Sequence, residues 1–397
     1  MIQIRTVDEL ELAGKRVFYR VDYNVPLEGG RISDATRIEE TLPTLKMMRE
    51  RDAAIVIGSH LGRPKGAPDA KYSLRPVQKK LAELLNADVQ WSEETVGEKA
   101  RQLASKLGPG QILLLENLRF NQGEEKNDRQ FAEKLRELAD TYVNDAFGAC
   151  HRAHASIVAL PQLFEPSRTA GGLLLVKELL FLQKVADGSE RPFVALLGGA
   201  KIAGKIEPLE ALVRLADTIL IGGGMANTFL AARGVPMGGS LVDKDSLEVA
   251  KRILAADSRA RIVLPEDLVA TDSLDNPKSI EVVSLPAGVP AERKAVDIGP
   301  RTIDKYAEVL RSAKMIFWNG PMGVFEREPF ARGTLAMARA IAESGAMSVV
   351  GGGESVEAVK ASGFADRVTH ISTGGGASLE FIAGEALPGV EVLRKRT

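Results

Sequence analysis

Arginine, histidine, aspartate and asparagine gather in short clusters in the first part of the chain, directly after apolar runs. The segment 20–26 reads R-V-D-Y-N-V-P, and strand alternation would place Arg20, Asp22 and Asn24 on one side. Similar clusters occur at Arg37 and at 59–64, 116–120 and 144–154. A guanidinium group can donate two parallel hydrogen bonds to a single phosphate or carboxylate group. These clusters therefore predict a site for a small anion.

Two histidines in the last cluster leave a second interpretation open. His151 and His154 are spaced i, i+3 and follow Asp145, a set that also suits a metal ion. Arg152 stands between them and would repel a cation, so anion binding is the favoured interpretation. A serine hydrolase is disfavoured because the chain has no G-x-S-x-G segment.

Four apolar runs in the second part of the chain end in glycines. They read V-A-L-L-G-G-A at 194–200, T-I-L-I-G-G-G at 218–224, S-V-V-G-G-G at 348–353 and H-I-S-T-G-G-G at 370–376. Glycine lets backbone N–H groups approach a phosphate, but it also serves tight turns that are needed for packing alone. Four such turns favour a nucleotide site. None of them completes G-x-G-x-x-G, so the dinucleotide fingerprint is absent.

Two lysines follow the first glycine turn. The segment 199–206 nearly matches a P-loop, but Ile206 replaces the Ser or Thr that would contact Mg²⁺. We therefore interpret Lys201 and Lys205 as a pair that shares one helix face, provided that the helix begins near Gly199. Such a pair suits a polyphosphate; two solvated surface lysines are the alternative.

These residues need a scaffold of alternating strands and helices. Short apolar runs predict strands at 16–21, 54–58, 111–115, 141–144, 193–197, 218–221, 261–264, 315–318, 348–350 and 368–372. Helical spacing lies between most of them, for example at 128–139 and 207–215. This alternation predicts an α/β fold with mainly parallel sheets, in which ligands bind at the carboxyl ends of strands. One amphipathic helix at 171–186 is expected to connect two lobes.

Composition narrows the class of protein. The chain has 397 residues, of which 45% are hydrophobic and 26% charged, with a net charge of −1. That charge disfavours a nucleic-acid binder, which is usually basic. Cys150 is the single cysteine, so no intramolecular disulfide can form and a reducing compartment is expected. The chain shows neither a signal-peptide stretch nor an apolar run of membrane-spanning length. We expect a cytoplasmic protein without nucleic-acid or membrane partners.

The clusters, taken in order, resemble phosphoglycerate kinase. The matching strings are R-V-D-Y-N-V-P at 20–26, S-D-A-T-R at 33–37, H-L-G-R-P at 60–64, L-E-N-L-R-F at 115–120, N-D-A-F-G at 144–148, H-R-A-H-A-S at 151–156, L-G-G-A-K at 197–201, G-G-G-M-A-N-T-F at 222–229, D-I-G-P at 297–300, W-N-G-P-M-G-V-F-E at 318–326 and S-T-G-G-G-A-S-L-E at 372–380. The resemblance spans nearly the whole chain.

The resemblance implies two Rossmann-like lobes joined by a helix, with the C-terminal segment folding back onto the N-terminal lobe. The expected bounds are 1–170 with 377–397 for a 3-phosphoglycerate-binding lobe, 171–187 for the connecting helix, and 188–376 for a nucleotide-binding lobe. It also implies a monomeric transferase of glycolysis and gluconeogenesis with a carboxyl group as acceptor. This enzyme transfers a phosphoryl group reversibly between 1,3-bisphosphoglycerate and MgADP, in line, after hinge closure, giving 3-phosphoglycerate and MgATP.

The site residues follow from the same motifs. The resemblance assigns the phosphoglycerate site to Asp22, Tyr23, Asn24, Arg37, His60, Leu61, Gly62, Arg63, Arg119 and Arg152. It assigns the nucleotide site to Lys205, Glu326, Gly352, Gly353, Glu354 and Ser355. It gives the catalytic roles on the transferred group to Arg37, Lys201, Gly352 and Gly375. Phosphoryl transfer needs alignment and charge neutralisation, so the lack of an obvious catalytic base is expected.

One departure concerns the metal. The family usually carries Asp before Ser or Thr after its third glycine turn, and this chain carries Glu354. The resemblance makes Glu354 the candidate ligand of Mg²⁺, which arrives with ATP or ADP. Three alternatives remain: a kinase for a different carboxylate, a catalytically silent nucleotide-binding protein, and a dehydrogenase, which the missing fingerprint disfavours.

Overall fold

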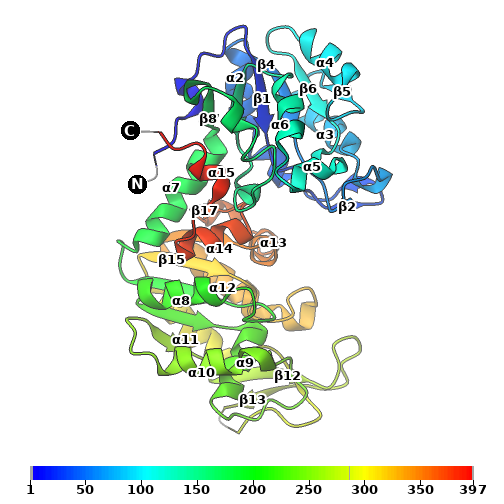
Figure 1. Cartoon of the computed structure of the whole chain (residues 1–397). Helices are drawn as coiled ribbons and strands as arrows, with labels where there is room; N and C mark the ends of the chain where they lie inside the picture. The colour runs from blue at the N-terminus through cyan, green and yellow to red at the C-terminus, as the bar shows by residue number, and fades with distance from the viewer. Residues whose placement is uncertain (1–2, 286, 396–397) are drawn as a thin grey trace. The chain divides into compact units, whose positions relative to one another are not determined.

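A computed structural model describes residues 3–285 and 287–395. The chain divides into two compact units, Met1–Leu180 together with Ala386–Thr397, and Phe181–Glu385. We call them unit 1 and unit 2 (Figure 1). Among the described residues, no helix combines the length and the apolar character that crossing a membrane requires.

Unit 1 is built on a six-stranded sheet in the order β5-β6-β4-β1-β7-β8, and all its strand pairs are parallel. Its strands are β1 (Arg16–Arg20), β4 (Ala54–Gly58), β5 (Gln90–Ser92), β6 (Ile112–Leu115), β7 (Thr141–Asn144) and β8 (Thr169–Gly171). The central strands are apolar and buried over nearly their whole length, as both faces of the sheet are covered.

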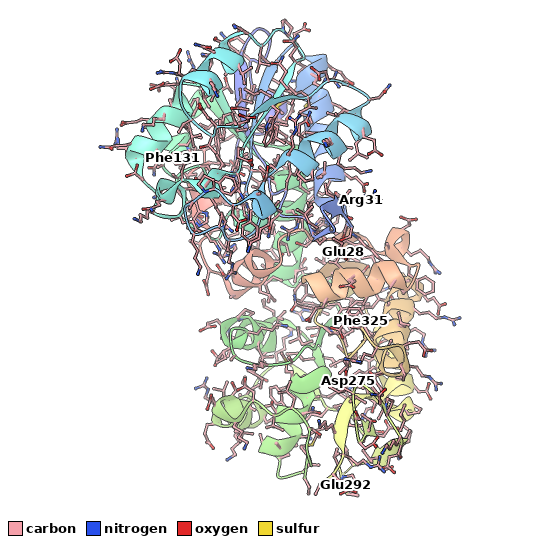
Figure 2. The ribbon with its side chains drawn as sticks, turned by 90° about the vertical axis from the view of Figure 1, so that its right-hand side faces the viewer. Glu28, Arg31, Phe131, Asp275, Glu292 and Phe325 are labelled. Carbon is pink, nitrogen blue, oxygen red and sulfur yellow. The ribbon has the colours of Figure 1, made fainter. Side chains whose placement is uncertain are left out.

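The helices of unit 1 are α1 (Thr36–Glu39), α2 (Leu42–Glu50), α3 (Arg75–Leu85), α4 (Glu98–Ser105), α5 (Gln122–Glu125), α6 (Arg129–Arg136) and α15 (Pro388–Glu391). Local chemistry explains the start of α6 and the end of α3. Asp128 caps α6 by accepting a 2.7 Å hydrogen bond from the Phe131 N–H. Asn86 ends α3 in the left-handed conformation, with φ 46°. A small hairpin, β2 (Leu27–Glu28) with β3 (Arg31–Ile32), carries the exposed Glu28 and Arg31 (Figure 2).

Unit 2 repeats the architecture with a second six-stranded parallel sheet in the order β11-β10-β9-β15-β16-β17. Its strands are β9 (Phe193–Leu197), β10 (Thr218–Ile221), β11 (Arg261–Val263), β15 (Met315–Asn319), β16 (Met347–Gly351) and β17 (His370–Ile371). Its helices are α8 (Ile206–Leu215), α9 (Gly223–Ala232), α10 (Leu247–Ala255), α11 (Pro300–Arg311), α12 (Arg332–Ser344), α13 (Gly353–Ala361) and α14 (Gly376–Ala383). Both lobes therefore have the mainly parallel α/β fold that was expected.

Unit 2 also holds an antiparallel sheet that the sequence patterns did not predict. Its order is β13-β12-β14, with β12 (Asp267–Thr271), β13 (Ile280–Ser284) and β14 (Lys294–Ile298). Ile280 and Val282 on β13 remain exposed, so this strand lacks the buried apolar run by which the other strands were recognised. The short strands β5 and β8 were also not predicted.

A single helix, α7 (Leu173–Asp187), runs from one unit into the other, and the division falls after Leu180. The C-terminal segment returns to unit 1, where Ile4 forms an antiparallel bridge with Arg394. The expected lobe bounds differ from this division at the connecting helix, which was set apart as 171–187, and at the C-terminal return. Helix α14 packs on α8 within unit 2, so the return begins at Ala386 rather than at 377.

Candidate active site

Asp22 and His60 follow the carboxyl ends of β1 and β4 in unit 1, and Arg37 from α1 joins them. Arg37 Nη1 lies 3.0 Å from Asp22 Oδ2, and His60 Nε2 lies 3.8 Å from Asp22 Oδ1. The strands pair in parallel, with Arg20 opposite Gly58, so the residues that follow each strand meet at one sheet edge. The structure thus joins three motifs that lie 15 and 23 positions apart in the sequence.

A loop after β4 extends this cluster. The Gly62 N–H donates to Asn24 Oδ1 over 2.8 Å, and the Gly62 carbonyl accepts from Arg119 Nη1 over 2.8 Å. Gly62 has φ 61°, and a Cβ there would lie 2.2 Å from the Tyr72 ring, so only glycine fits. Asn117 fixes the same loop by donating to the Leu61 carbonyl over 2.7 Å. Backbone geometry therefore links the loop to Asn24 and Arg119.

The segment after β7 supplies the last basic group. Arg152 Nε donates to His151 Nε2 over 3.1 Å, and both side chains are half-buried. Arg119 Nε and His154 Nδ1 are buried and have no hydrogen-bond partner among the described residues. Buried polar nitrogens are costly without a partner, and an anionic ligand would supply one. The Arg119 nitrogen does lie 3.3 Å from Glu125 Oε1, but not with hydrogen-bond geometry.

The protonation states of its side chains give this cluster the positive charge that an anion site needs. Burial alone would raise the pKa of Asp22, but the charge of Arg37 and its basic neighbours outweighs this and lowers it to about 2. Burial lowers the pKa of His60 well below its usual range, and it lowers the pKa of His154 to about 3. The carboxylates of Asp22 and Glu125 therefore face the guanidinium groups of Arg37, Arg119 and Arg152 and neutral imidazoles, which leaves the cluster positive.

Some predicted phosphoglycerate residues turn their side chains elsewhere. Tyr23 is buried in the core and its hydroxyl lies 2.9 Å from Thr41 Oγ1. Leu61 packs in the same core. Only the backbone of these two residues can serve a ligand at the sheet edge. Arg63 is exposed and makes no hydrogen bond or ion pair with other residues in the described part of the chain.

The metal alternative for the histidine pair gains no support from this geometry. The Asp145 carboxylate accepts from the Tyr19 hydroxyl over 2.6 Å and from the Leu175 N–H over 2.9 Å, so it is bonded to the N-terminal turn of α7. Within residues 3–285 and 287–395, no group of three or more His, Cys, Asp or Glu side chains is placed to hold a metal ion.

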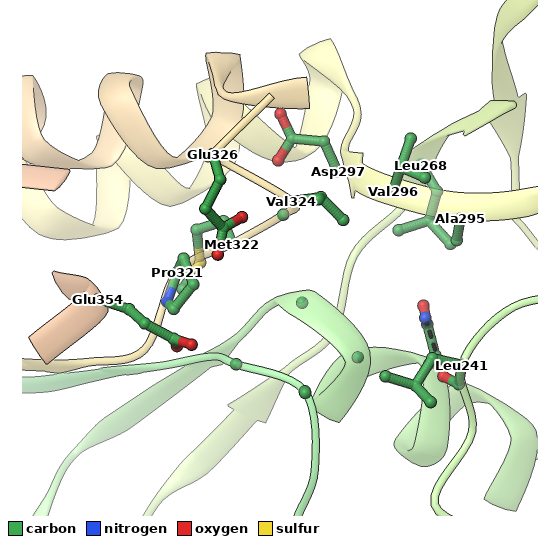
Figure 3. Close-up of a pocket in the computed structure, with 16 residues that line it drawn as sticks. Leu241, Leu268, Ala295, Val296, Asp297, Pro321, Met322, Val324, Glu326 and Glu354 are labelled. Atoms are coloured by element: carbon green, nitrogen blue, oxygen red, sulfur yellow. Dashed lines mark hydrogen bonds between the residues drawn. The ribbon is translucent and has the colours of Figure 1, made fainter. Parts of the chain in front are cut away.

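Unit 2 contains a pocket at the carboxyl ends of its sheet strands. Figure 3 shows Glu326 and Glu354 towards one end of it and the apolar Leu241, Leu268 and Val296 towards the other. Its cavity volume is about 180 Å³, and Gly199, Gly223 and Gly224 contribute backbone to its wall. An apolar slot with acidic groups at one end suits a flat ring attached to a polyhydroxylated, phosphorylated group.

The four glycine turns follow β9, β10, β16 and β17, but they serve two different purposes. A Cβ on Gly198 would lie 2.1 Å from the Pro321 carbonyl oxygen, and one on Gly224 would lie 2.5 Å from the Ala200 carbonyl oxygen. The first two turns thus need glycine for packing. Beside Gly353 and Gly375 a Cβ would meet no heavy atom within 4 Å. Open space therefore lies beside Gly353 and Gly375 at the N-termini of α13 and α14, where backbone N–H groups can bind phosphate, whereas a Cβ on Gly352 would lie 2.9 Å from Asn319 Nδ2.

The expected helix face for Lys201 and Lys205 is wrong. Helix α8 begins only at Ile206, and both lysines lie in the loop before it. Gly204 with φ 78° and a hydrogen bond from the Ala203 N–H to Asp243 shape this loop instead. Lys205 Nζ turns back to donate to the Gly198 carbonyl over 3.2 Å, whereas Lys201 is exposed.

Glu354 and Lys205 approach each other near the first glycine turn. A Cβ on Gly199 would lie 3.3 Å from Lys205 Nζ and 4.0 Å from Glu354 Oε2. Burial lowers the pKa of Lys205, and the charge of Glu354 opposes that shift. Ser355 is buried and its hydroxyl accepts from the Gly320 N–H over 2.6 Å, so it fixes the turn after β15. A single exposed carboxylate suits Mg²⁺, which keeps several waters and binds through substrate phosphates.

Sequence patterns missed several residues of these sites. Arg20 was expected to lie beside Asp22 and Asn24, but it is fully buried beneath the cluster, paired with Glu124. Asp297 lies in the pocket wall and accepts from the Gly333 N–H at the start of α12 over 2.6 Å. Burial raises the pKa of Asp297 to about 7. Asp297 belongs to the D-I-G-P string, which was the available signal; Glu124 and Leu241 had none.

Comparison with known proteins decides the family. The phosphoglycerate kinase family model matches residues 7–385. The chain belongs to the phosphoglycerate kinase family. It is 50% identical to the phosphoglycerate kinase of Desulforudis audaxviator, with 99% of each chain covered, and 49% identical to that of Koribacter versatilis, with 98% of this chain and 99% of the relative covered.

Solved structures agree with this assignment. The phosphoglycerate kinase from Coxiella burnetii superposes with a TM-score of 0.87 at 37% identity, covering 98% of this chain and 99% of that chain. The phosphoglycerate kinase from Pyrococcus horikoshii OT3 gives a TM-score of 0.88 at 35% identity, with 98% of each chain covered. The reaction of the family is reversible phosphoryl transfer between 1,3-bisphosphoglycerate and MgADP, giving 3-phosphoglycerate and MgATP.

Proposed function

We propose that this chain, as a phosphoglycerate kinase, binds phosphoglycerate at the basic cluster of unit 1 and the nucleotide at the pocket of unit 2. The observation that carries the proposal is the positive cluster around Asp22, with its buried nitrogens that lack protein partners. Such nitrogens match the carboxylate and phosphate groups of 3-phosphoglycerate.

In unit 1, the proposed ligands are the side chains of Asn24, Arg37, His60, Arg119 and Arg152. Arg63 is exposed and can bind the same anion from the loop. Asp22 orients Arg37 towards the proposed anion site through the 3.0 Å ion pair. Tyr23, Leu61 and Gly62 contribute backbone only.

In unit 2, the apolar slot receives the purine and Glu326 accepts from the ribose hydroxyls. The N–H groups at Gly352, Gly353 and Ser355 open α13 and bind phosphate oxygens, aided by Lys205. Glu354 would hold Mg²⁺ together with those phosphates, and the ion supplies charge neutralisation at the transferred group.

Transfer needs no general base. In the direction that consumes ATP the nucleophile is a carboxylate, whose ordinary pKa is about 4, so it is already ionised at neutral pH. Arg37, Lys201 and the backbone around Gly352 and Gly375 stabilise the charge on the phosphoryl group between donor and acceptor. In-line transfer requires the two reacting oxygens to approach closely, which we propose occurs by closure of the units.

Calorimetric titration of Arg152→Ala tests the assignment of ligands to units. Loss of a two-point charged contact should weaken 3-phosphoglycerate about 10- to 150-fold and leave MgATP affinity unchanged. Glu326→Gln should show the reverse pattern. If either variant weakens both ligands equally, the assignment fails. ATP-dependent formation of 1,3-bisphosphoglycerate, followed by a coupled dehydrogenase, measures the reaction itself.

A further inference from the structure

A fully buried ion pair lies beneath the basic cluster of unit 1. Arg20 and Glu124 each expose 0% of their side chain, and Arg20 Nη2 lies 3.8 Å from Glu124 Oε1. Burying two charges costs several kcal/mol per ion unless hydrogen bonds satisfy them. Neither side chain reaches the surface, so neither can bind the substrate directly.

Ser156 connects the two charges. Its hydroxyl accepts from Arg20 Nε over 2.7 Å and donates to Glu124 Oε1 over 2.6 Å. Its backbone N–H donates to Glu124 Oε2 over 3.0 Å. Both carboxylate oxygens and the Arg20 Nε–H therefore have fixed partners, and the guanidinium plane has one orientation.

That orientation directs a donor at His60. Arg20 Nη2 lies 3.4 Å from His60 Nδ1. A guanidinium group is always protonated and only donates, so His60 Nδ1 must be the acceptor and cannot carry a proton. The opposite nitrogen, Nε2, lies 3.8 Å from Asp22 Oδ1, in the cluster proposed to bind the anion.

We propose that Arg20, Glu124 and Ser156 are positioning residues that hold His60 as a neutral imidazole with its proton on Nε2. His60 then donates an N–H to the bound phosphoglycerate without adding a charge. This inference rests on the proposed function for the role of that donor, although the tautomer itself does not.

The surroundings of His60 agree with a neutral ring. The charged groups facing it are Asp22 on one side and Arg20, Arg37 and Arg119 on the others. Burial and the three guanidinium groups lower the pKa of His60, against the opposing effect of Asp22. An imidazolium at this position would have two donors, one of them facing Arg20.

Nitrogen-15 NMR of the full-length chain labelled at histidine tests the tautomer directly. The chain has four histidines, so loss of one signal in His60→Gln assigns the ring. Long-range proton–nitrogen correlations at pH 7 should show a protonated Nε2 and an unprotonated Nδ1, unchanged down to pH 5.5. A proton on Nδ1, or titration of His60 above pH 6, overturns the proposal.

Variants test the role of the buried pair. Arg20→Lys keeps the positive charge but removes the planar guanidinium group. Glu124→Gln keeps the shape of the side chain but removes its negative charge. Each should convert the His60 signal to a mixture of tautomers and raise the KM for 3-phosphoglycerate roughly 3- to 10-fold, with the KM for MgATP unchanged. A purely structural role would lower the melting temperature and leave the tautomer and the ratio of the two KM values unchanged.

Matched controls come from the same unit. Arg16 lies on β1, as Arg20 does, and Arg16→Lys alters its half-buried ion pair with Asp140. Glu133→Gln alters the exposed ion pair between Glu133 and Arg129. Neither should change the His60 signal. If Arg20→Lys fails to fold, the wild-type tautomer still decides the proposal. A protonated Nε2 that does not respond to 3-phosphoglycerate would contradict the proposed function and leave the tautomer intact.

Discussion

At the scale of single residues, the two candidate sites differ in how they handle charge. The cluster of unit 1 concentrates guanidinium groups around the ionised Asp22, whereas unit 2 places the exposed carboxylates Glu326 and Glu354 beside glycine turns. In the proposed function, the first arrangement binds an anion by side chains, and the second leaves phosphate binding to backbone N–H groups and Lys205. Each arrangement yields a separate test.

Lys201→Ala should reduce kcat far more than it changes either KM. Its ammonium group is exposed before α8, and the proposed role is to neutralise the phosphoryl group during transfer. A comparable cation contributes on the order of 10³-fold or more to the rate. Steady-state kinetics measure the effect, with the exposed Lys244→Ala as the control. A kcat within a factor of three of the wild type would contradict the assignment.

Glu354→Asp tests the metal ligand. Mg²⁺ demands near-octahedral geometry at about 2.1 Å, so a shorter side chain that binds it directly should raise the Mg²⁺ concentration for half-maximal rate. An unchanged Mg²⁺ dependence would show that the carboxylate does not bind the ion directly, and Glu357→Asp on the same helix provides the control.

At the scale of elements, the strand-to-helix turns of unit 2 are all rich in glycine. The physical reason for the glycine differs from one turn to another. Gly224 is forced by close contact with the Ala200 backbone, whereas Gly353 opens α13 into free space. Glycine in the first case keeps two turns packed together. In the second case it leaves the helix N-terminus accessible to phosphate.

Gly224→Ala and Gly353→Ala should therefore have opposite signatures. The first should lower the free energy of unfolding by about 1–3 kcal/mol, because its Cβ overlaps a backbone carbonyl. The second should leave that free energy unchanged or raise it by up to about 1 kcal/mol, and it should raise the KM for MgATP because its Cβ obstructs the proposed phosphate position. Urea unfolding and steady-state kinetics on both variants provide the measurement. Equal losses of stability would refute the distinction.

At the scale of the whole molecule, the proposal places the two substrates on different units. Transfer requires reacting atoms about 3–3.5 Å apart, so this proposal requires the units to close when both ligands are bound. Each ligand alone supplies only part of the contacts that favour closure, and both together should shift the population most.

Small-angle scattering should therefore show the smallest radius of gyration in the ternary complex with 3-phosphoglycerate and a non-reactive nucleotide. The unliganded protein and each binary complex serve as references under the same buffer conditions. An unliganded protein as compact as the ternary complex would show that closure does not accompany binding.

The sequence by itself determined the fold class, the parallel sheets and the family. Buried parallel strands require continuous apolar runs, and polar residues that follow such runs must meet at one sheet edge, so both features can be read locally. For this reason the strands β1, β4, β7 and β9 were predicted nearly to the residue.

Only the tertiary structure decided what depends on contacts between distant segments. The burial of Arg20 against Glu124 joins positions 104 residues apart, and no local pattern specifies such a pair. The start of α8 at Ile206 depends on a loop that Asp243 holds, so local spacing placed it too early. The division of the glycine turns into packed and open ones likewise depends on which backbone lies opposite each of them, which the fold alone determines.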